Sequence, residues 1–249
     1  MLELQNVSFS VDIDGKEKKI INDISLSIPD GKLIVVTGPN GSGKSSLAKL
    51  IAGIYVPTAG KIVFNGVEVT DMSITDRARL GIGFAFQQPV KFKGITVLDL
   101  LRIAAGKRIS ITEACEFLSS VGLCARDYIN REVNSSLSGG ELKRIEIATV
   151  IAGKASVSLF DEPEAGIDLW SFRNLIEVFR RMRERNKNGS IVIISHQERI
   201  LDIADEIVVL RNGAIEKRGE KEKILPTLIG TSAAISDCKM GAMKEGSEE

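Results

Sequence analysis

A glycine-rich stretch near the N-terminus constrains the fold of this chain more than any other feature. It follows the apolar run Leu33 to Val36 and opens a periodic apolar segment from Ser46 to Ala52. The stretch consists of Gly38, Pro39, Asn40, Gly41, Ser42, Gly43, Lys44, Ser45 and Ser46. Four residues separate the first glycine from the Gly-Lys-Ser triplet, which is the spacing of a phosphate-binding loop (P-loop) between a strand and a helix.

The residue types in this P-loop suit a nucleotide with magnesium. Glycines adopt backbone angles that other residues avoid, so successive amide groups can turn toward phosphate oxygens. The helix that follows presents its positive end to the anion, and Lys44 is expected to reach the β- and γ-phosphates. The Ser45 hydroxyl is a candidate ligand of Mg²⁺. We therefore expect a nucleotide-binding site.

Length, charge and hydropathy narrow the class of protein. A chain of 249 residues buries roughly 70 to 75% of its unfolded surface, so it needs no disulfide or metal to fold. Lys+Arg and Asp+Glu balance at 33 each, which argues against nucleic-acid binding as the main role. No apolar run approaches the ~20 residues that cross a bilayer. We expect a cytoplasmic protein that does not itself insert into the membrane.

The three cysteines show no metal-binding spacing. Cys115 shares a helical face with Ile111 and Leu118, which predicts a small residue of the core. Cys238 lies in a polar tail, where both an inert thiol and a reactive thiol stay open as interpretations.

The apolar pattern predicts one domain with a helical insertion. Residues 2 to 36 largely alternate between apolar and polar, and two Asn-Gly pairs, Asn65-Gly66 and Asn212-Gly213, are typical of hairpin turns. Buried strands are expected at residues 80–86, 157–160, 191–194 and 207–210, and helical spacing runs from residue 96 to about 149. The expected division is a nucleotide-binding core with an antiparallel layer (1–88 and 156–230), a helical subdomain (89–155) and a tail (231–249).

Two further motifs carry chemistry. The apolar run from Val157 ends in adjacent acids, of which Asp161 is expected to hold the Mg²⁺ shell and Glu162 to orient or deprotonate a water molecule. Residues 137–141, Leu-Ser-Gly-Gly-Glu, form a second glycine-bearing loop before a helix, which predicts a second place for phosphate oxygens.

These motifs together resemble those of the ABC ATPase family. The string from Leu137 to Arg144 is similar to the family's signature, and with the P-loop, Gln87, the acid pair and His196 in this order the resemblance covers essentially the whole chain. It implies an α/β P-loop NTPase fold: a RecA-like parallel sheet, an antiparallel β subdomain and an all-helical signature subdomain. It also implies ATP and Mg²⁺ as ligands and ATP hydrolysis as the activity.

The resemblance also implies an ATP-dependent head-to-tail homodimer. In that family the signature loop of one copy, here Ser138, Gly139 and Gly140, closes on the γ-phosphate held by the other copy. Asp168 matches the aspartate that couples the two sites across the dimer. The two sites would therefore act together.

Three other positions take their expected roles from this resemblance. Gln87 matches a glutamine that contacts Mg²⁺ and water and senses the bound partner, and His196 matches a histidine that contacts the γ-phosphate and the catalytic glutamate. Many members of the family stack an aromatic residue on adenine, whereas this chain offers Val11 there, with Phe9 as the alternative. Without the aromatic stack, we expect modest ATP affinity and weak base selectivity.

Shorter strings resemble the SufC ATPase of the SUF iron-sulfur cluster assembly system. They are Gly83 to Val90, Ser195 to Leu201, and Val11. This resemblance implies a SufB- or SufD-like scaffold protein as the partner. The alternative is the ATP-binding subunit of an ABC membrane transporter with a separate permease chain, since Lys91 to Val97 resembles a transporter segment. A DNA-maintenance ATPase is disfavoured because the sequence has no long heptad run.

Overall fold

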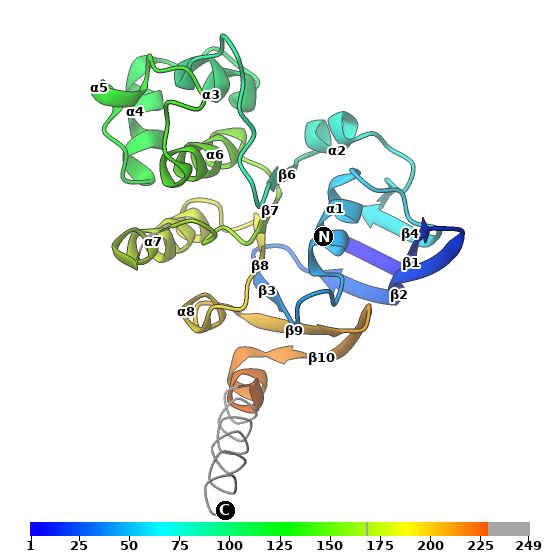
Figure 1. Ribbon diagram of the computed structural model, residues 1–249. Helices are drawn as coiled ribbons and strands as arrows, with labels where there is room; N and C mark the ends of the chain where they lie inside the picture. Colours follow the sequence, from blue (N-terminus) through cyan, green and yellow to red (C-terminus); the bar gives the residue numbers. More distant parts are fainter. Residues whose placement is uncertain (168, 229–249) are drawn as a thin grey trace, which may run out of the picture.

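A six-stranded sheet forms the centre of the computed structural model, which describes residues 1–167 and 169–228 (Figure 1). Its strand order is β10-β9-β3-β8-β7-β6, and all neighbours run parallel except the antiparallel pair β9–β10. The strands are β3 (Leu33–Thr37), β6 (Ile82–Ala85), β7 (Val157–Asp161), β8 (Ser190–Ile194), β9 (Glu206–Arg211) and β10 (Ala214–Glu220). Every residue of β3, β7 and β8 is buried, as expected for parallel strands covered on both faces.

A four-stranded antiparallel sheet lies beside the central sheet, in the order β2-β1-β4-β5. Its strands are β1 (Leu2–Ile13), β2 (Lys16–Ile28), β4 (Ala59–Phe64) and β5 (Val67–Glu68). The predicted hairpin at Asn65-Gly66 joins β4 to β5, and both turn residues have positive φ, at 50° and 79°. The sequence therefore identified this layer from its alternation and its turns.

Helices connect β6 to β7, as the helical spacing predicted. They are α3 (Val97–Ala105), α4 (Ile111–Ser120), α5 (Ala125–Tyr128) and α6 (Gly139–Gly153). Helices α3, α4 and α6 each begin with a capping box, in which the N-cap residue exchanges hydrogen bonds with an acidic residue three positions later. The N-cap residues are Thr96, Ser110 and Ser138. Because each box satisfies amide groups that a helix start leaves free, the local sequence sets where these helices begin.

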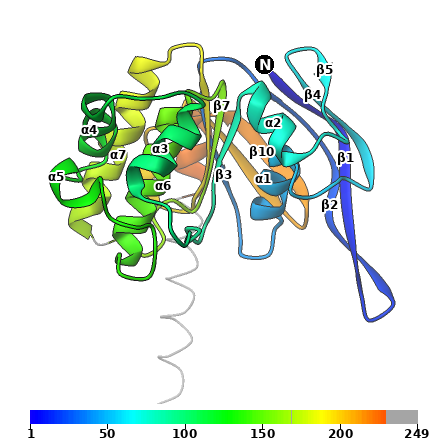
Figure 2. The ribbon, with the colours of Figure 1, turned by 90° about the horizontal axis from the view of Figure 1, so that it is seen from above.

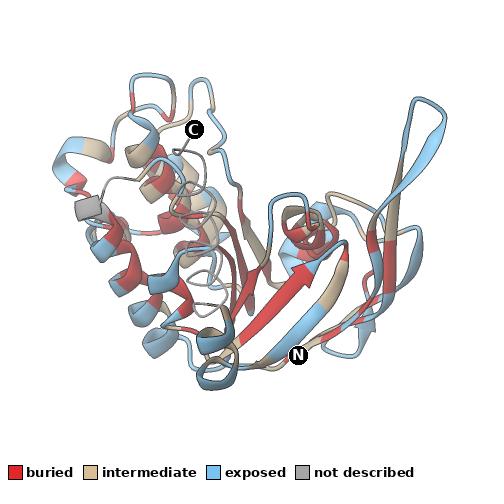
Figure 3. Cartoon of the chain, turned by 60° about the horizontal axis from the view of Figure 1, so that its bottom comes forward, coloured by how far each residue is buried: buried red, intermediate tan, exposed pale blue. Residues whose placement is uncertain are grey.

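The remaining helices cover the two faces of the central sheet. They are α1 (Lys44–Ala52), α2 (Ile74–Leu80), α7 (Leu169–Arg185), α8 (Glu198–Leu201) and a last helix at 221–228. Alternate residues of β3 point into two different cores: Leu33 and Val35 face the helical side, and Ile34 and Val36 face α1 and the antiparallel sheet. Figure 2 shows these two layers on opposite sides of the central strands, and Figure 3 shows the buried strands between them.

Helix α2 differs from the sequence-based expectation, which placed the start of a strand at Leu80. Leu80 ends this helix instead, and β6 begins at Ile82. The fully buried Arg77 fixes α2, because its guanidinium donates to the carbonyl of Leu50 at 2.6 Å near the end of α1. It also donates to the carbonyl of Ile51 at 2.9 Å, so the cation lies at the negative end of α1. An apolar pattern does not reveal a helix held by a buried arginine.

The predicted fold class is confirmed: a parallel sheet core, an antiparallel layer and a helical segment in one α/β chain. None of the helices over residues 1–167 and 169–228 has the length and apolar character of a membrane span. The predicted division into subdomains stays a prediction. The expected tail over 231–249, with Cys238, lies outside the described residues.

Candidate nucleotide-binding site

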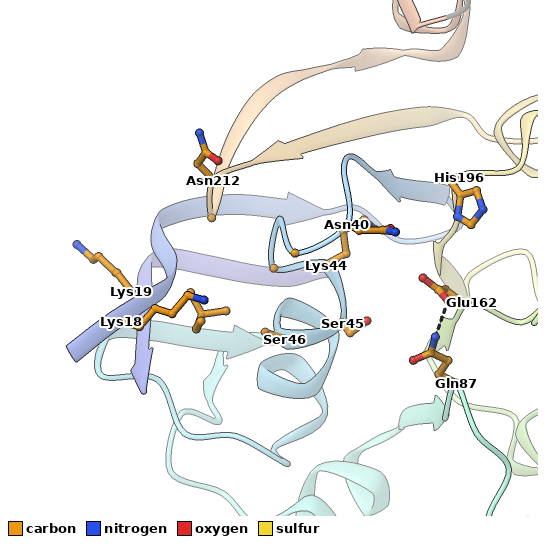
Figure 4. Close-up of a pocket in the computed structure, with 14 residues that line it drawn as sticks. Lys18, Lys19, Asn40, Lys44, Ser45, Ser46, Gln87, Glu162, His196 and Asn212 are labelled. Carbon is orange, nitrogen blue, oxygen red and sulfur yellow. Dashed lines mark hydrogen bonds between the residues drawn. The ribbon is translucent and has the colours of Figure 1, made fainter. Parts of the chain in front are cut away.

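A cavity of about 750 Å³ opens at the carboxyl end of the central strands (Figure 4). The P-loop lies in the middle, Lys18 and Asn212 lie toward one end, and Glu162 and His196 lie toward the other. The residues that line it are Lys18, Lys19, Ile20, Asn40, Gly41, Gly43, Lys44, Ser45, Ser46, Gln87, Glu162, His196, Asn212 and Gly213. Ligands of parallel α/β sheets bind at this edge, so the fold and the cavity agree.

The P-loop connects β3 to α1 and is shaped to receive phosphate. Gly38 has a φ of 141°, and a Cβ atom there would lie only 2.0 Å from the carbonyl oxygen of Leu210, so this position requires glycine. Lys44 is 6% exposed, and its Nζ donates to the carbonyl oxygens of Gly38 at 2.8 Å and Pro39 at 2.9 Å. The loop therefore holds the Lys44 ammonium group beside the start of α1, where an anion would bind.

Burial lowers the pKa of Lys44, while the nearby Glu162 and Asp161 carboxylates oppose this shift. Removing an ammonium group from water disfavours its charged form, and negative groups restore it. A bound phosphate would act in the same direction as the carboxylates. The surroundings of Lys44 thus favour an anionic ligand.

Ser45 and Asp161 meet at the point where β7 ends beside α1. The Ser45 Oγ donates a hydrogen bond to Asp161 Oδ1 at 2.9 Å, and Asp161 is 1% exposed. Burial raises the pKa of the Asp161 carboxyl, and the hydrogen bond from Ser45 opposes this. A hydroxyl and a carboxylate oxygen are the hard ligands that Mg²⁺ prefers, and a cation would relieve the cost of burying this carboxylate. The residues present therefore fit a magnesium ion.

Three polar side chains from neighbouring strands converge at one end of the cavity. Gln87 follows β6, Glu162 follows β7 and His196 follows β8, and these strands are adjacent in the sheet. The Gln87 Nε2 donates to Glu162 Oε2 at 2.5 Å (Figure 4). Because parallel strands end at the same edge, residues far apart in sequence share one site.

Glu164 adds a carboxylate that the sequence analysis did not single out. Its Oε1 accepts a hydrogen bond from the Ser195 hydroxyl, whose oxygen in turn accepts from the backbone N–H of Gln197 at 3.0 Å. Burial raises the pKa of Glu164, and the hydrogen bond from Ser195 and the nearby His196 oppose this. The only sequence signal was a third acid two positions after Glu162.

The sequence analysis placed Val11, or alternatively Phe9, beside the adenine, and neither residue lines the cavity. Val11 lies in β1 opposite Lys18 of β2 and is not among the residues that line the cavity. Phe9 stacks on Tyr55 with ring centroids 5.0 Å apart. Lys18, Lys19 and Ile20 line the end of the cavity beyond the P-loop instead, and the lining residues include no Phe, Tyr or Trp. Sequence alternation alone could not tell which strand of the hairpin faces the cavity.

The signature loop lies apart from this cavity. Ser138 is the N-cap of α6 and exchanges hydrogen bonds with Glu141, at 2.7 Å to its carboxylate and 3.3 Å from its N–H. Ser138 and Gly139 are exposed, Gly140 is half-buried, and only Leu137 is buried. The three loop residues 138–140 do not line the cavity. Asp168 lies outside the described residues.

Comparisons with known proteins agree with this geometry. A sequence profile described as "ABC transporter" matches residues 21–165, which is more than half of the 249 residues. The uncharacterized ABC transporter ATP-binding protein MJ0035 of Methanocaldococcus jannaschii is 36% identical over 215 residues, covering 83% of this chain and 85% of that protein. The probable ATP-dependent transporter ycf16 of Cyanophora paradoxa is 35% identical over 237 residues, covering 89% of each.

A solved structure shares the fold. The dimeric, post-hydrolysis ATP-binding cassette MJ0796, bound to ADP and Pi, matches with a TM-score of 0.80 at 24% identity, covering 89% of this chain and 99% of that one. From the sequence profile and these relatives, together with the P-loop and the acid pair at the end of β7, it follows that this chain belongs to the ABC transporter family and is an ATPase of that family.

Proposed function

We propose that two copies of this chain close head to tail over two ATP molecules and hydrolyse them to drive a conformational change in a partner protein. The observation that carries this proposal is the exposed signature loop, residues 138–140, at the start of α6 and outside the cavity of its own chain. The start of a helix favours phosphate oxygens. A loop that is open to solvent can meet the phosphate held by a second copy, so each copy would complete its neighbour's site.

Within each cavity the residues would have separate tasks. Lys44 and the P-loop amides would bind the β- and γ-phosphates. Ser45, Asp161 and Gln87 would hold Mg²⁺, which when bound supplies positive charge to the phosphate oxygens. Glu162 would orient the attacking water and accept its proton.

Two positions outside this group would complete the site. His196, at the same end of the cavity as Glu162, would contact the γ-phosphate. Asp168 would couple the two sites of the dimer.

The partner that we propose is a SufB- or SufD-like scaffold protein in iron-sulfur cluster assembly, in the cytoplasm. Support comes from the similarity of residues 83–90 and 195–201 to SufC segments. The first segment runs into an apolar groove of about 120 Å³ between the central sheet and the helical segment. The groove is lined by Phe84, Phe86, Val90, Phe92, Leu100, Val133, Leu142, Ile145, Glu146 and Thr149. We propose that the scaffold binds in this groove.

A second candidate is the ATP-binding subunit of a membrane transporter with a separate permease chain. The names of both relatives favour it, since each is described as a transporter or as part of one. The two candidates differ in the partner. Tagged protein captured from its native cells should bring down a SufB- or SufD-like scaffold from the cytosolic fraction if the first is right. An integral membrane protein from the detergent extract would support the second.

Action between two copies can be tested by mixing two inactive chains, Ser138→Arg and Lys44→Ala. Each variant alone lacks one half of every site. A mixed dimer restores one intact site of two, so random pairing should recover about a quarter of the wild-type ATPase rate. Phosphate release over a range of mixing ratios measures this.

The control is a mixture of Ser138→Arg with the double variant Ser138→Arg/Lys44→Ala. No intact site can form in that mixture, so it should stay inactive. Equal rates in the two mixtures, or no recovery at any ratio, would contradict the proposed dimer.

A further inference from the structure

Helix α6 carries a buried ion pair that the site described above does not use. Lys143 is 1% exposed, and its Nζ lies 3.2 Å from Oε2 of Glu146, whose side chain is 12% exposed. Burial raises the pKa of Glu146, and the Lys143 cation opposes this. Placing two charges away from water is costly unless their other polar contacts are satisfied. The other hydrogen bonds of Lys143 and Glu146 therefore indicate which part of the chain the pair binds.

Both side chains of the pair bind the backbone of Phe86. The Lys143 Nζ donates to the carbonyl oxygen of Phe86 and lies 3.4 Å from that of Gln87. The Glu146 Oε1 accepts the N–H of Phe86 at 2.7 Å. The pairing of β6 with β7 ends one residue earlier, at Ala85, so the sheet leaves these backbone groups without strand partners. The ion pair therefore supplies the hydrogen-bond partners of the Phe86 backbone, beyond the last pair of residues in the sheet.

The residue that follows this anchored backbone reaches the proposed catalytic carboxylate. Gln87 donates its side-chain N–H to Glu162 Oε2 at 2.5 Å. Hydrogen bonds from α6 to the Phe86 backbone, the covalent chain to Gln87, and the hydrogen bond from the Gln87 side chain therefore connect α6 to Glu162. Phe86 and Glu146 also line the apolar groove in which we propose that the partner binds.

We propose that Lys143 and Glu146 are positioning residues for ATP hydrolysis: they hold the Phe86–Gln87 backbone so that the Gln87 side chain is placed against Glu162. The inference rests on the role proposed above for Glu162. Because Ser138 caps the start of α6, a single helix links the loop proposed to contact the second copy to the ion pair that binds the Phe86 backbone. The pair would thus connect the dimer contact, the partner groove and the catalytic carboxylate.

The alternative is that the pair only stabilises the fold, and this alternative makes a different prediction. A buried ion pair can often be replaced by apolar residues of similar size without loss of stability, whereas removing one partner leaves an unpaired buried charge. Lys143→Met and Glu146→Met should therefore each destabilise the chain, and the double variant should recover the part of the stability that the unpaired charge cost. No replacement methionine can bind the Phe86 backbone, so a positioning role would stay lost in the double variant.

The experiment compares the full chain with the double variant Lys143→Met/Glu146→Met in urea unfolding and steady-state ATP hydrolysis. We expect a stability above that of either single variant, a KM for ATP within about twofold, and a kcat lowered about tenfold, because the P-loop is intact while Gln87 is no longer held. The matched control is Glu177→Met/Arg180→Met, an exposed ion pair with the same three-residue spacing on α7, which should leave kcat unchanged. A double variant with wild-type kcat would overturn the proposal.

A second comparison asks whether the pair acts through Gln87. In a Gln87→Ala chain, adding the double substitution should lower kcat no further, since the group that the pair positions is already missing. A full additional tenfold loss would overturn the proposal. If the wild-type chain and Glu162→Gln hydrolysed ATP equally fast, the role of Glu162 would fail instead, so the two failures are distinguishable.

Discussion

Glu162 is held in a backbone conformation that its residue type seldom adopts. Its φ is 44°, in the left-handed region, which costs a non-glycine residue about 1–3 kcal/mol. Its backbone N–H donates to the carbonyl of Ile194 at 3.0 Å, and its side chain accepts from Gln87. These contacts with residues following or ending the neighbouring strands hold the carboxylate over the cavity. Strain of this kind is often found at functional positions.

The first prediction concerns this carboxylate. Glu162→Gln keeps the size and shape of the side chain but removes the group proposed to accept a proton from water. We expect ATP binding to persist and turnover to fall by ~10²-fold or more. Isothermal titration with ATP and a phosphate-release assay measure the two quantities. Turnover close to that of the wild-type chain would rule out this role for Glu162.

The second prediction follows from the buried Glu164. Burial raises its pKa, so between the unfolded and folded pKa values the folded chain binds more protons than the unfolded chain. The contribution of Glu164 to the free energy of unfolding therefore falls as pH rises through that window, by about 1.4 kcal/mol for each unit of difference. Glu164→Gln removes the charge and keeps an oxygen that accepts from Ser195.

The expected outcome is that Glu164→Gln stabilises the chain relative to wild type more at about pH 8 than at about pH 5. Urea unfolding at both pH values measures this difference. Glu177→Gln, an exposed position on α7, serves as the control and should show no such trend. A larger gain at the lower pH would contradict the assigned direction of the pKa shift.

At the scale of elements, two Asn-Gly hairpins with the same local conformation have different surroundings. Gly66 (φ 79°) and Gly213 (φ 78°) both follow an asparagine with φ 50°. A Cβ atom on Gly66 would meet nothing within 4 Å, whereas one on Gly213 would lie 2.5 Å from the carbonyl oxygen of Ile20. Gly213 of the β9–β10 turn is therefore packed against β2 at the end of the cavity that Lys18 lines. Gly66 of the β4–β5 turn faces open space, although the neighbouring Asn65 binds Met1.

The third prediction uses this pair. Gly66→Ala should cost about 1–2 kcal/mol of unfolding free energy, the cost of a left-handed residue alone. Gly213→Ala should cost about 1–3 kcal/mol more, because the added methyl group displaces the β2 backbone. It should also weaken ATP binding, since Ile20 lines the cavity. Equal destabilisation in urea unfolding would show that the packing of this turn against β2 does not matter.

At the scale of the whole molecule, the apolar groove is the surface where the central sheet meets the helical segment. Val90 lines it and is 45% exposed, and among the described residues Val67 of β5 offers a comparable exposed valine at 47%. The two positions lie in different parts of the fold, since β5 belongs to the antiparallel sheet. This pair provides a matched test of the proposed partner surface.

The fourth prediction is that Val90→Asp prevents capture of the partner from native cells, whereas Val67→Asp captures as much as the wild-type chain. A charge in an apolar contact loses its hydration without a compensating partner. ATP hydrolysis by the isolated chain should not change in either variant, because neither residue lines the nucleotide cavity. Retained capture by Val90→Asp would place the partner elsewhere.

Short stretches of consecutive residues were enough to predict the P-loop, the acid pair at the end of β7 and both hairpins. Each of these features depends on local backbone angles or on the spacing of a few residues, and both follow from the residue types in a short stretch of sequence. The contacts around Glu162 could not be obtained this way. Gln87 meets it across 75 positions, and Lys143 reaches the Phe86 carbonyl across 57. Strand order and helix packing bring these groups together, and no local pattern encodes that order.

Tertiary packing also explains why Val11, which was expected beside the adenine, does not line the cavity. Which strand of the β1–β2 hairpin lines the cavity depends on how the antiparallel sheet packs against the P-loop and the β9–β10 turn, and Lys18, Lys19 and Ile20 of β2 line it. Alternation predicts that one face of a strand is buried but does not say what lies against the other face. The sequence alone therefore determined the motifs made of neighbouring residues. The contacts between residues far apart in the sequence were decided by the tertiary structure, because they depend on how strands and helices pack.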